Sequence, residues 1–198
     1  MFVTFEGLDG SGKSTQARLL AEALAADGRK VVATREPGGT ELGERIRELL
    51  LGGLAVAPWA EAALFASARA QLVDEVIAPA LARGDDVVCD RYLDSSLAYQ
   101  GIARGLGLDR VLELNVHAIR GVLPDRTYLL VIDREESARR RVGPGDRIER
   151  EDDEFRARVA EAYGELAAAF PQRIVTIDGA RPVGEIGREI LDELRQHS

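Results

Sequence analysis

The chain has 198 residues, of which 45% are hydrophobic and 30% are charged, a composition typical of one globular domain with a well-developed core. The net charge of −8 disfavours a nucleic-acid partner because it repels the phosphate backbone. Membrane insertion is also disfavoured, since no stretch approaches the roughly 20 apolar residues of a membrane span. We expect a cytoplasmic protein, because no signal peptide is recognisable and the single cysteine, Cys89, cannot form an internal disulfide.

Short apolar runs alternate with longer segments of helical periodicity, a pattern that predicts βαβ units and a parallel sheet. The predicted strands are Phe2–Glu6, Lys30–Thr34, Asp86–Asp90, Tyr128–Ile132 and Ile174–Ile177. The predicted helices are Lys13–Ala26, Glu41–Leu51, Ala60–Ala82, Ser95–Ala103, Asp109–Arg120, Ser137–Arg141, Asp152–Ala169 and Pro182–Gln196. We therefore expect a single α/β domain over residues 1–198, with a five-stranded parallel sheet between two layers of helices.

Chemically suggestive residues follow three of these strands. Glu6 and Gly7 end the first strand, Arg35–Thr40 follow the second, and Asp90–Tyr92 follow the third. Ligands of open parallel sheets bind beyond the carboxyl ends of the strands. We expect these three segments to form one ligand site.

A phosphate-binding motif lies between the first strand and the first helix. Residues 7–14 match G-x-x-x-x-G-K-[ST] in the structural context that this motif requires. The glycines let backbone N–H groups surround the β-phosphate, Lys13 bridges the β- and γ-phosphates, and the Ser14 hydroxyl binds Mg²⁺. The predicted ATP phosphate site consists of Gly7, Leu8, Asp9, Gly10, Ser11, Gly12, Lys13, Ser14 and Thr15.

Many nucleotide-binding proteins share this motif, so other features must identify the class. A guanine-specific switch is disfavoured because the only asparagine, Asn115, is followed by Val116 and not by the lysine of an Asn-Lys-x-Asp motif. The strand that ends at Asp90 continues into Arg91, which suggests a metal-side carboxylate next to a cation for a second anionic substrate. The sequence thus favours a kinase with a phosphorylated acceptor and a metal bound by Ser14 and Asp90. A kinase for another nucleotide or nucleoside, and a non-catalytic nucleotide-binding switch, remain as alternatives.

Three stretches together resemble the bacterial thymidylate kinases along nearly the whole chain. They are Phe5–Thr15, Thr34–Thr40 and Asp90–Gly101, the last with the motif Asp90-Arg91-Tyr92. The resemblance implies a P-loop fold, transfer of the γ-phosphoryl group of ATP to dTMP with Mg²⁺, and a homodimer, for which the apolar stretch Ala60–Ala82 offers a helix-packing surface.

The resemblance also assigns the acceptor site residue by residue. Arg47 and Arg91 would clamp the dTMP phosphate, Phe65 would stack on thymine, and Arg69 would reach a carbonyl group of the base. Ser96 and Gln100 would complete the polar contacts to the base, Tyr99 would pack beside the deoxyribose, and Asp9 and Glu36 would lie near the 3′-hydroxyl and the metal–phosphate region. Without the resemblance, Phe65 and Tyr99 would be interpreted as core side chains, and Arg47 and Arg69 as solvated helix residues.

Phosphoryl transfer to an anionic phosphate oxygen needs charge neutralisation and water exclusion, but no general base. We expect Lys13 and Arg91 to neutralise charge, and residues 142–153 to form a short lid. The P-loop contains no arginine, so the resemblance implies that a catalytic arginine comes from the lid, with Arg141 and Arg147 as candidates. The alternative is a solvated loop in which Glu149, Glu151 and Asp152 balance these charges.

Overall fold

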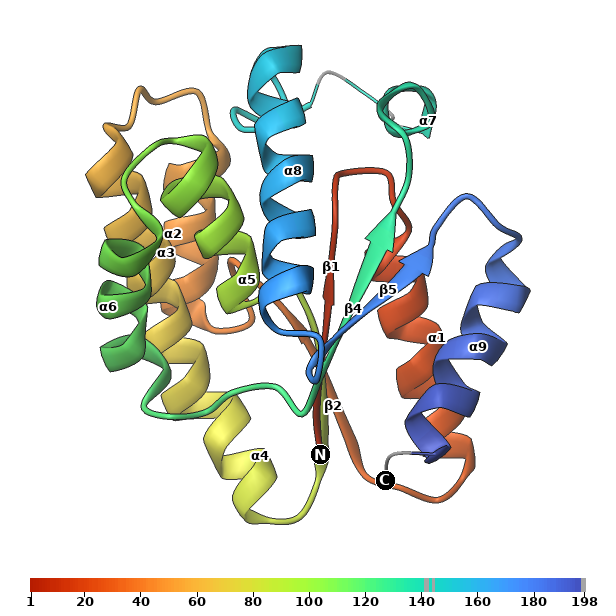
Figure 1. Cartoon of the computed structure of the whole chain (residues 1–198). Helices are drawn as coiled ribbons and strands as arrows, with labels where there is room; N and C mark the ends of the chain where they lie inside the picture. The colour runs from red at the N-terminus through yellow and green to blue at the C-terminus, as the bar shows by residue number, and fades with distance from the viewer. Residues whose placement is uncertain (141–142, 144, 197–198) are drawn as a thin grey trace.

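A five-stranded parallel sheet forms the centre of the computed structural model, which describes residues 1–140, 143 and 145–196 (Figure 1). The strands are β1 (Phe2–Glu6), β2 (Val31–Arg35), β3 (Asp86–Asp90), β4 (Arg126–Val131) and β5 (Ile174–Asp178). Their order across the sheet is β2-β3-β1-β4-β5, and every neighbouring pair is parallel. The predicted fold class is therefore confirmed, and β1 lies in the middle of the sheet.

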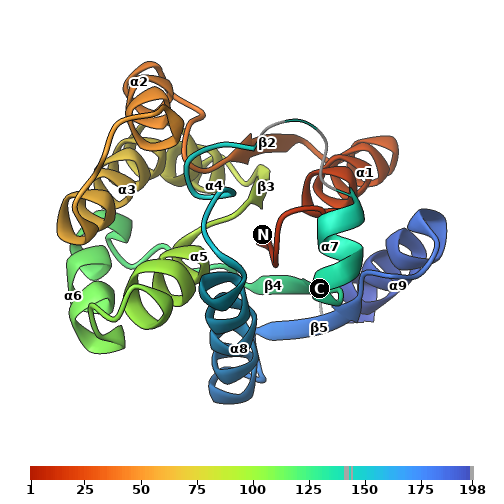
Figure 2. The same ribbon diagram turned by 90° about the horizontal axis from the view of Figure 1, so that it is seen from above.

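Helices cover both faces of the sheet (Figure 2). On one face, α1 (Lys13–Ala26) packs beside α9 (Val183–Gln196). The other side carries α2 (Glu41–Leu51), α3 (Pro58–Leu72), η1 (Val73–Ile77), α4 (Ala78–Ala82), α5 (Leu93–Ser96), η2 (Leu97–Ala103), α6 (Leu108–Ile119) and α8 (Asp153–Ala169), where η1 and η2 are π-helical. Helix α7 (Arg134–Arg140) follows β4 at the carboxyl edge of the sheet (Figure 1).

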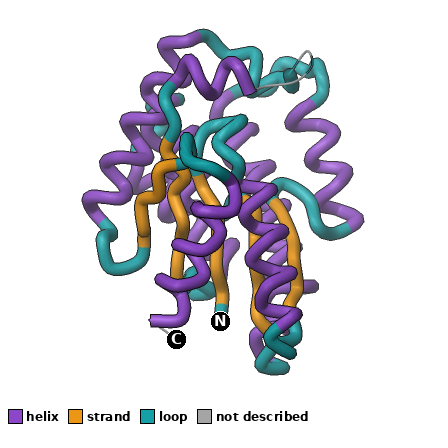
Figure 3. The backbone as a smooth tube through the Cα atoms, turned by 90° about the vertical axis from the view of Figure 1, so that its right-hand side faces the viewer, coloured by secondary structure: helices purple, strands orange, loops and turns teal. Residues whose placement is uncertain are grey.

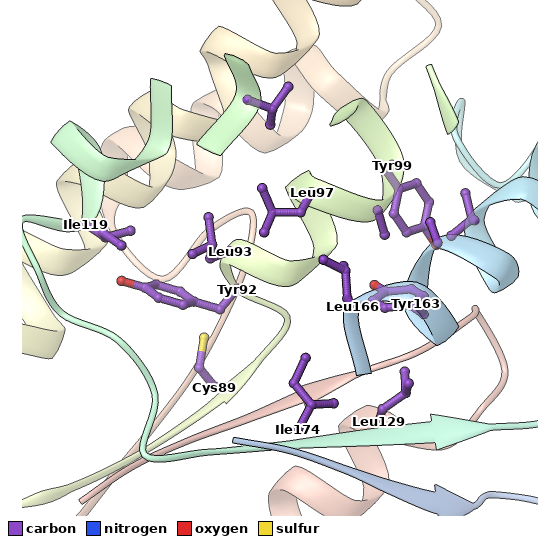
Figure 4. Close-up of a cluster of buried hydrophobic side chains, with 14 of the residues drawn as sticks. Cys89, Tyr92, Leu93, Leu97, Tyr99, Ile119, Leu129, Tyr163, Leu166 and Ile174 are labelled. Atoms are coloured by element: carbon purple, nitrogen blue, oxygen red, sulfur yellow. The ribbon is translucent and has the colours of Figure 1, made fainter. Parts of the chain in front are cut away.

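Side chains of β1 alternate between two hydrophobic clusters because successive residues of a strand point to opposite faces. Val3 and Phe5 pack with Leu20 of α1 and Ile190 of α9. Phe2 belongs to the larger cluster on the other face, to which α5, η2 and α8 contribute (Figure 4). Both faces of the central strand are thus closed, and the carboxyl edge of the sheet is left for ligands. Figure 3 shows the sheet enclosed by helices, with the N-terminus at the opposite edge.

Strand and helix boundaries differ from the predicted ones by up to three residues. The second strand begins at Val31 and includes Arg35, which pairs with Asp90 of β3. The fourth strand begins at Arg126, two residues before the predicted start, because the polar side chain of Arg126 does not fit the apolar pattern used to predict strands. The helix predicted at Ser137–Arg141 begins at Arg134, because the carboxylate of Asp133 accepts a hydrogen bond from the Glu136 backbone N–H and starts the helix early.

Two predicted helices contain π-helical turns. The segment predicted as one helix over Ala60–Ala82 runs from Pro58 through α3, η1 and α4. Proline suits the first helical turn, because the backbone N–H that it lacks would have no partner within the helix there. The segment predicted at Ser95–Ala103 is α5 followed by η2, in which the Arg104 N–H donates to the Tyr99 carbonyl five residues earlier. Within the described residues, no helix has the length and apolar character needed to cross a bilayer.

Candidate active site

The P-loop between β1 and α1 folds tightly because glycines occupy its turns. Gly7 has a φ of +136°, and a Cβ atom there would lie 2.4 Å from the carbonyl oxygen of Leu130. Gly10 has a φ of +81°, and its Cβ would lie 3.0 Å from the carbonyl oxygen of Ser137. Only glycine fits both positions. The loop can therefore surround a phosphate at the N-terminus of α1, where the helix dipole favours an anion.

Lys13, the first residue of α1, is buried within this loop. Its Nζ donates to the carbonyl oxygen of Leu8 at 2.7 Å and lies 3.9 Å from Oδ1 of Asp9. Burial lowers the pKa of Lys13 to about 8, and the positive charge of Arg91 contributes, whereas Asp9 opposes the shift. An anionic phosphate would oppose this shift and hold Lys13 in its ammonium form when a nucleotide binds.

Ser14 and Asp90 lie together at the ends of α1 and β3. The Ser14 hydroxyl donates to Oδ2 of Asp90, and Oδ1 of Asp90 is buried with no hydrogen-bond partner within the described part of the chain. Hard oxygen atoms of this kind suit Mg²⁺, which proteins commonly hold through one or two carboxylates together with substrate phosphates and water. The described residues contain no cluster of three or more His, Cys, Asp or Glu that could hold a metal alone. The pair therefore fits a metal that arrives with nucleotide phosphates.

A cavity of about 500 Å³ opens beyond the carboxyl ends of β1, β2 and β3, a size typical of small-molecule sites. Most of the predicted site residues line it together: Asp9, Gly10, Gly12, Lys13, Ser14, Thr15, Glu36, Arg47, Phe65, Asp90, Arg91, Ser96, Tyr99 and Gln100. Gly7, Leu8 and Ser11 belong to the P-loop behind its wall, and Arg69 and Arg147 are not among the lining residues. The three segments that follow β1, β2 and β3 thus meet at one cavity at the carboxyl edge of the sheet.

Arg91 follows β3 in a left-handed conformation, with a φ of +67°, which is unusual for a residue with a side chain. Its guanidinium donates to Asp9 at 2.5 Å, to Ser95 at 3.2 Å and to the Tyr163 hydroxyl at 3.3 Å. It also lies 5.4 Å from the ring centre of Tyr99. Although burial lowers the pKa of Arg91, the effects of Tyr99 and Asp9 outweigh it and raise the pKa above its ordinary value. A strained backbone thus holds a permanent cation in the cavity wall.

The carboxylate of Glu6 organises the surroundings of Arg91. Glu6 is 0% exposed, and its Oε2 accepts from the Ser95 hydroxyl at 2.6 Å and the Tyr163 hydroxyl at 2.8 Å. Its Oε1 accepts from the Tyr92 N–H at 2.8 Å. Burial raises the pKa of Glu6, whereas Arg91 opposes the shift. Glu6 therefore fixes two of the hydroxyl groups that contact Arg91.

Arg35 and Arg47 also line the cavity, which with Arg91 and Arg140 carries four guanidinium groups. Arg47 of α2 donates its Nη1 to the Pro37 carbonyl at 2.9 Å, and Arg35 stands at the end of β2 in an ion pair with Glu44. Burial lowers the pKa of Arg47, with the charge of Arg35 as a second cause. An anionic ligand in the cavity would relieve the repulsion between Arg35 and Arg47, and guanidinium groups suit the binding of a phosphate.

The aromatic residues Phe65 and Tyr99 lie on different helices but line the same cavity. Phe65 is half-buried on α3, and Tyr99 is held on η2 by edge contacts with Phe155 and Tyr163, at ring-centre distances of 6.2 and 6.3 Å. The wide π-helical turn lets Tyr99 and Gln100, which are adjacent in sequence, both reach the cavity. π-Helical turns are often found at functional sites.

Arg69 lies behind the cavity wall and is only 1% exposed. Its Nε and Nη2 donate to Oε2 of Glu36 at 2.8 and 2.5 Å, and Nη2 also donates to the Tyr92 carbonyl at 2.9 Å. Its Nη1 donates to Ser96 at 3.0 Å and to the side-chain carbonyl of Asn115. All five N–H groups of Arg69 are therefore used within the protein. To contact a ligand, Arg69 would have to exchange one of these partners.

Glu36, the partner of Arg69, keeps one oxygen available at the cavity. Its Oε1 is buried without a hydrogen-bond partner among the described residues, and Glu36 lines the cavity. Burial raises the pKa of Glu36 to about 7, while Arg69 opposes the shift. The arrangement offers an acceptor to a hydroxyl or N–H group of a ligand.

Helix α7 approaches the cavity from the side of the P-loop. Ser137 of α7 donates to the Asp9 carbonyl at 2.7 Å, and Arg140 lines the cavity. Arg147 instead pairs with Glu61 at 2.6 Å and donates to the Leu50 carbonyl at 2.8 Å. Arg141, the other predicted lid arginine, lies outside the described residues. The structure thus shows one candidate bound away from the cavity and adds Arg140 as a cation beside the P-loop.

Several residues that shape the site were not predicted from the sequence. Tyr163 and Asn115 lie on α8 and α6, and no local pattern links them to the P-loop. The sequence offers only a weak indication that Glu61 has a structural role: it is a carboxylate in the alanine-rich start of a helix, with no basic residue nearby in sequence to pair with. Arg140 stands in a run of arginines, where spacing does not indicate which side chain faces the cavity.

A P-loop at the centre of a parallel sheet, joined to an arginine-lined cavity, defines a P-loop protein that binds a nucleotide next to a second anionic ligand. The family model for thymidylate kinase matches residues 5–190. Curated thymidylate kinases of Pelotomaculum thermopropionicum and Leifsonia xyli subsp. xyli are 52% and 53% identical to the chain. Each alignment covers 96% of this chain, together with 90% of the first relative and 92% of the second. A crystal structure of thymidylate kinase from Ehrlichia chaffeensis superposes with a TM-score of 0.81 at 34% identity, over 98% of both chains. The chain belongs to the thymidylate kinase family and is a phosphotransferase.

Proposed function

We propose that the protein transfers the γ-phosphoryl group of ATP to dTMP, which gives dTDP and contributes to dTTP biosynthesis. The observation that carries this proposal is the shared cavity, which is lined by the P-loop residues Lys13 and Ser14, by Arg47 and Arg91, and by Phe65. Such a cavity can hold two phosphorylated ligands with their phosphates facing each other.

The donor phosphates lie in the P-loop, where backbone N–H groups and Lys13 hold them. Mg²⁺, bound by Ser14 and Asp90, would neutralise charge on the ATP phosphates. Asp9 and Arg140 line the same cavity. The P-loop connects β1 to α1, Ser14 belongs to α1 and Asp90 ends β3, so these three elements set the positions of the donor and the metal.

The acceptor phosphate binds between Arg47 and Arg91, whose planar guanidinium groups can each bind two oxygens. Phe65 stacks on the base and Tyr99 packs beside the sugar. The buried Oε1 of Glu36 is a suitable acceptor for a hydroxyl group of the nucleotide, and Asp9 lies on the phosphate side. Because the attacking oxygen is already anionic, the chemistry depends on alignment and charge neutralisation.

The base is read by Ser96 and Gln100, with Arg69 immediately behind Ser96. Arg69 can contribute by exchanging its bond to Ser96 for a base carbonyl, or by holding the Ser96 hydroxyl as a donor. Both routes favour the 4-carbonyl of thymine over the 4-amino group of cytosine, since a guanidinium can only donate.

Residues 142–153, of which 142 and 144 lie outside the described residues, act as a lid that excludes water during transfer. The proposal is supported by Asp146, Ile148 and Glu149, which line the cavity. Arg141 and Arg147 stay the candidates for a catalytic lid arginine, and Arg147 can serve only if it leaves Glu61. We further propose a cytoplasmic homodimer, in line with the single, buried Cys89 and the exposed face of α3.

The test is a coupled assay of ADP release with ATP and, separately, dTMP, dUMP, dCMP, dGMP, AMP or thymidine. Lys13→Ala serves as the control for contaminating kinases, because loss of a preorganised charge lowers kcat at least ~100-fold, equivalent to about 2.7 kcal/mol. dTMP should give the highest kcat/KM. Preference for another acceptor would indicate a different nucleotide kinase, and ATP turnover independent of every acceptor would indicate a nucleotide-binding switch.

A further inference from the structure

Glu61 is a buried acid that the phosphoryl-transfer step does not use. It stands in the first turn of α3, is 1% exposed, and lies beside η2. Its Oε1 accepts from Gln100 Nε2 at 2.9 Å and Arg104 Nε at 3.2 Å. Its Oε2 accepts from Arg104 Nη2 at 3.2 Å and Arg147 Nη2 at 2.6 Å. Four donors thus occupy the four acceptor sites of one carboxylate.

These contacts keep Glu61 ionised. Burial alone raises its pKa, but the hydrogen bonds from Arg104, Gln100 and Arg147 outweigh burial, so that the pKa of Glu61 is lowered. An ionised carboxylate only accepts hydrogen bonds. It can therefore bind the NH₂ end of the Gln100 amide but not the carbonyl end.

A fixed amide orientation matters because Gln100 lines the cavity and is itself 1% exposed. With Nε2 held by Glu61, Oε1 is the end that can accept a hydrogen bond from a ligand. Thymine carries an N–H group at position 3, whereas cytosine has a bare nitrogen acceptor there. An oxygen presented by Gln100 matches thymine and opposes cytosine.

We propose that Glu61 is a positioning residue for base selection, which fixes the Gln100 amide so that its carbonyl oxygen faces the acceptor base. Glu61 does not touch the nucleotide and acts through Gln100. The inference rests on the proposed function, because it assumes that the base of the acceptor lies next to Gln100.

The decisive variant is Glu61→Gln, which keeps the size of the side chain. Its carbonyl oxygen would keep the Nη2 donors of Arg104 and Arg147, and its NH₂ group would face Gln100 and lose the bond from Arg104 Nε. The Gln100 amide would then turn to accept that bond and present its own NH₂ to the base. We expect the dTMP/dCMP ratio of kcat/KM to fall at least ~10-fold. The KM for ATP should stay within about twofold, because the P-loop is not involved.

The matched control is Asp86→Asn, which also removes a buried, ion-paired carboxylate but at the amino end of β3, away from the cavity. It should leave the dTMP/dCMP ratio unchanged. In a Gln100→Leu background, Glu61→Gln should cause no additional fall in the ratio, since the residue through which it acts is absent. An equal fall in that background would overturn the proposal, as would an unchanged ratio in the single variant.

If the Glu61→Gln variant does not fold, Glu61→Asp tests the positioning role of Glu61 instead. It keeps the charge but withdraws the carboxylate from Gln100 by one methylene, and we expect an intermediate fall of about threefold in the ratio. A ratio equal to that of the wild type would contradict the proposal. The wild type in the same assay separates the two levels of inference: if it does not phosphorylate dTMP, the proposed function fails, and if it does while the variants keep its ratio, only the role of Glu61 fails.

Discussion

Buried charge is concentrated around the cavity, and each charged residue there has a specific partner. Glu6 lies beneath Arg91, Glu36 beside Arg69, and Glu61 beneath Gln100. Burying a charge costs several kcal/mol unless hydrogen bonds compensate. These acids therefore hold donors in fixed directions before a ligand arrives, which is the condition for selective binding of an anionic nucleotide.

Arg69→Met tests the most enclosed of these pairs. The substitution leaves Glu36 buried without its cation and removes five hydrogen bonds, so we expect the free energy of unfolding at pH 8 to fall by about 3–5 kcal/mol. The dTMP/dCMP ratio of kcat/KM should also fall, with the ATP KM nearly unchanged. Urea denaturation and steady-state kinetics measure the two effects. Arg18→Met, which breaks an exposed pair with Glu22, is the control and should cost under about 1 kcal/mol. Equal losses in the two variants would contradict the burial argument.

The pH dependence of stability tests the state of Glu36. Its folded pKa of about 7 exceeds the ordinary value of 4.5, so the folded state retains a proton that the unfolded state has released. The stability that this group contributes is complete below pH 4.5 and is lost as the pH rises through about 7. Between pH 4.5 and pH 8 the wild type should lose about 3 kcal/mol relative to Glu36→Gln. Urea denaturation of both proteins at several pH values provides the measurement, and parallel pH profiles would refute the assignment.

At the scale of elements, local motifs were predictable and contacts between distant helices were not. The P-loop follows from eight consecutive residues, and its glycines, strand and helix appear where the sequence places them. The π-helical turn of η2 leaves no sequence signal, because it depends on packing against α6 and α8. The same holds for Arg69, which the resemblance assigned to the base site. Its partners Glu36, Tyr92, Ser96 and Asn115 are all distant from it in sequence.

The role of Arg147 in the lid also depends on contacts between elements that are distant in sequence. In the structure Arg147 is anchored to Glu61 and to the end of α2, yet residues on either side line the cavity. If Arg147 leaves Glu61 during transfer, Arg147→Ala should lower kcat at least ~10-fold and change the dTMP KM by less than about twofold. Steady-state kinetics at saturating ATP measures this. Arg150→Ala, which removes an exposed arginine of the same segment, is the control. A normal kcat in Arg147→Ala would leave Arg141 as the remaining candidate.

At the scale of the whole molecule, the face of α3 that points away from the cavity is the surface through which we expect two copies of the chain to form a dimer. Ala60, Ala63 and Ser67 are exposed one turn apart on α3, and the large side chain of Trp59 is exposed at the start of the same helix. Neighbouring α6 exposes Val116. Small side chains allow two helices to approach closely, and a two-fold axis would place this face against its own copy.

We therefore expect sedimentation equilibrium at micromolar concentration to give particles of about twice the chain mass of 21.5 kDa. Ala63→Arg should shift the protein to the monomer, because a guanidinium in the middle of a helix-packing surface is both too large and unpaired. Ala168→Arg, at an exposed position of α8, should not. Since Phe65 lies two residues from Ala63 on the same helix, a dimer across this face would stiffen the wall of the base site, and the monomeric variant should have a higher dTMP KM at an unchanged ATP KM. A dimer that persists in Ala63→Arg would place the interface elsewhere, and monomers in the wild type would exclude it.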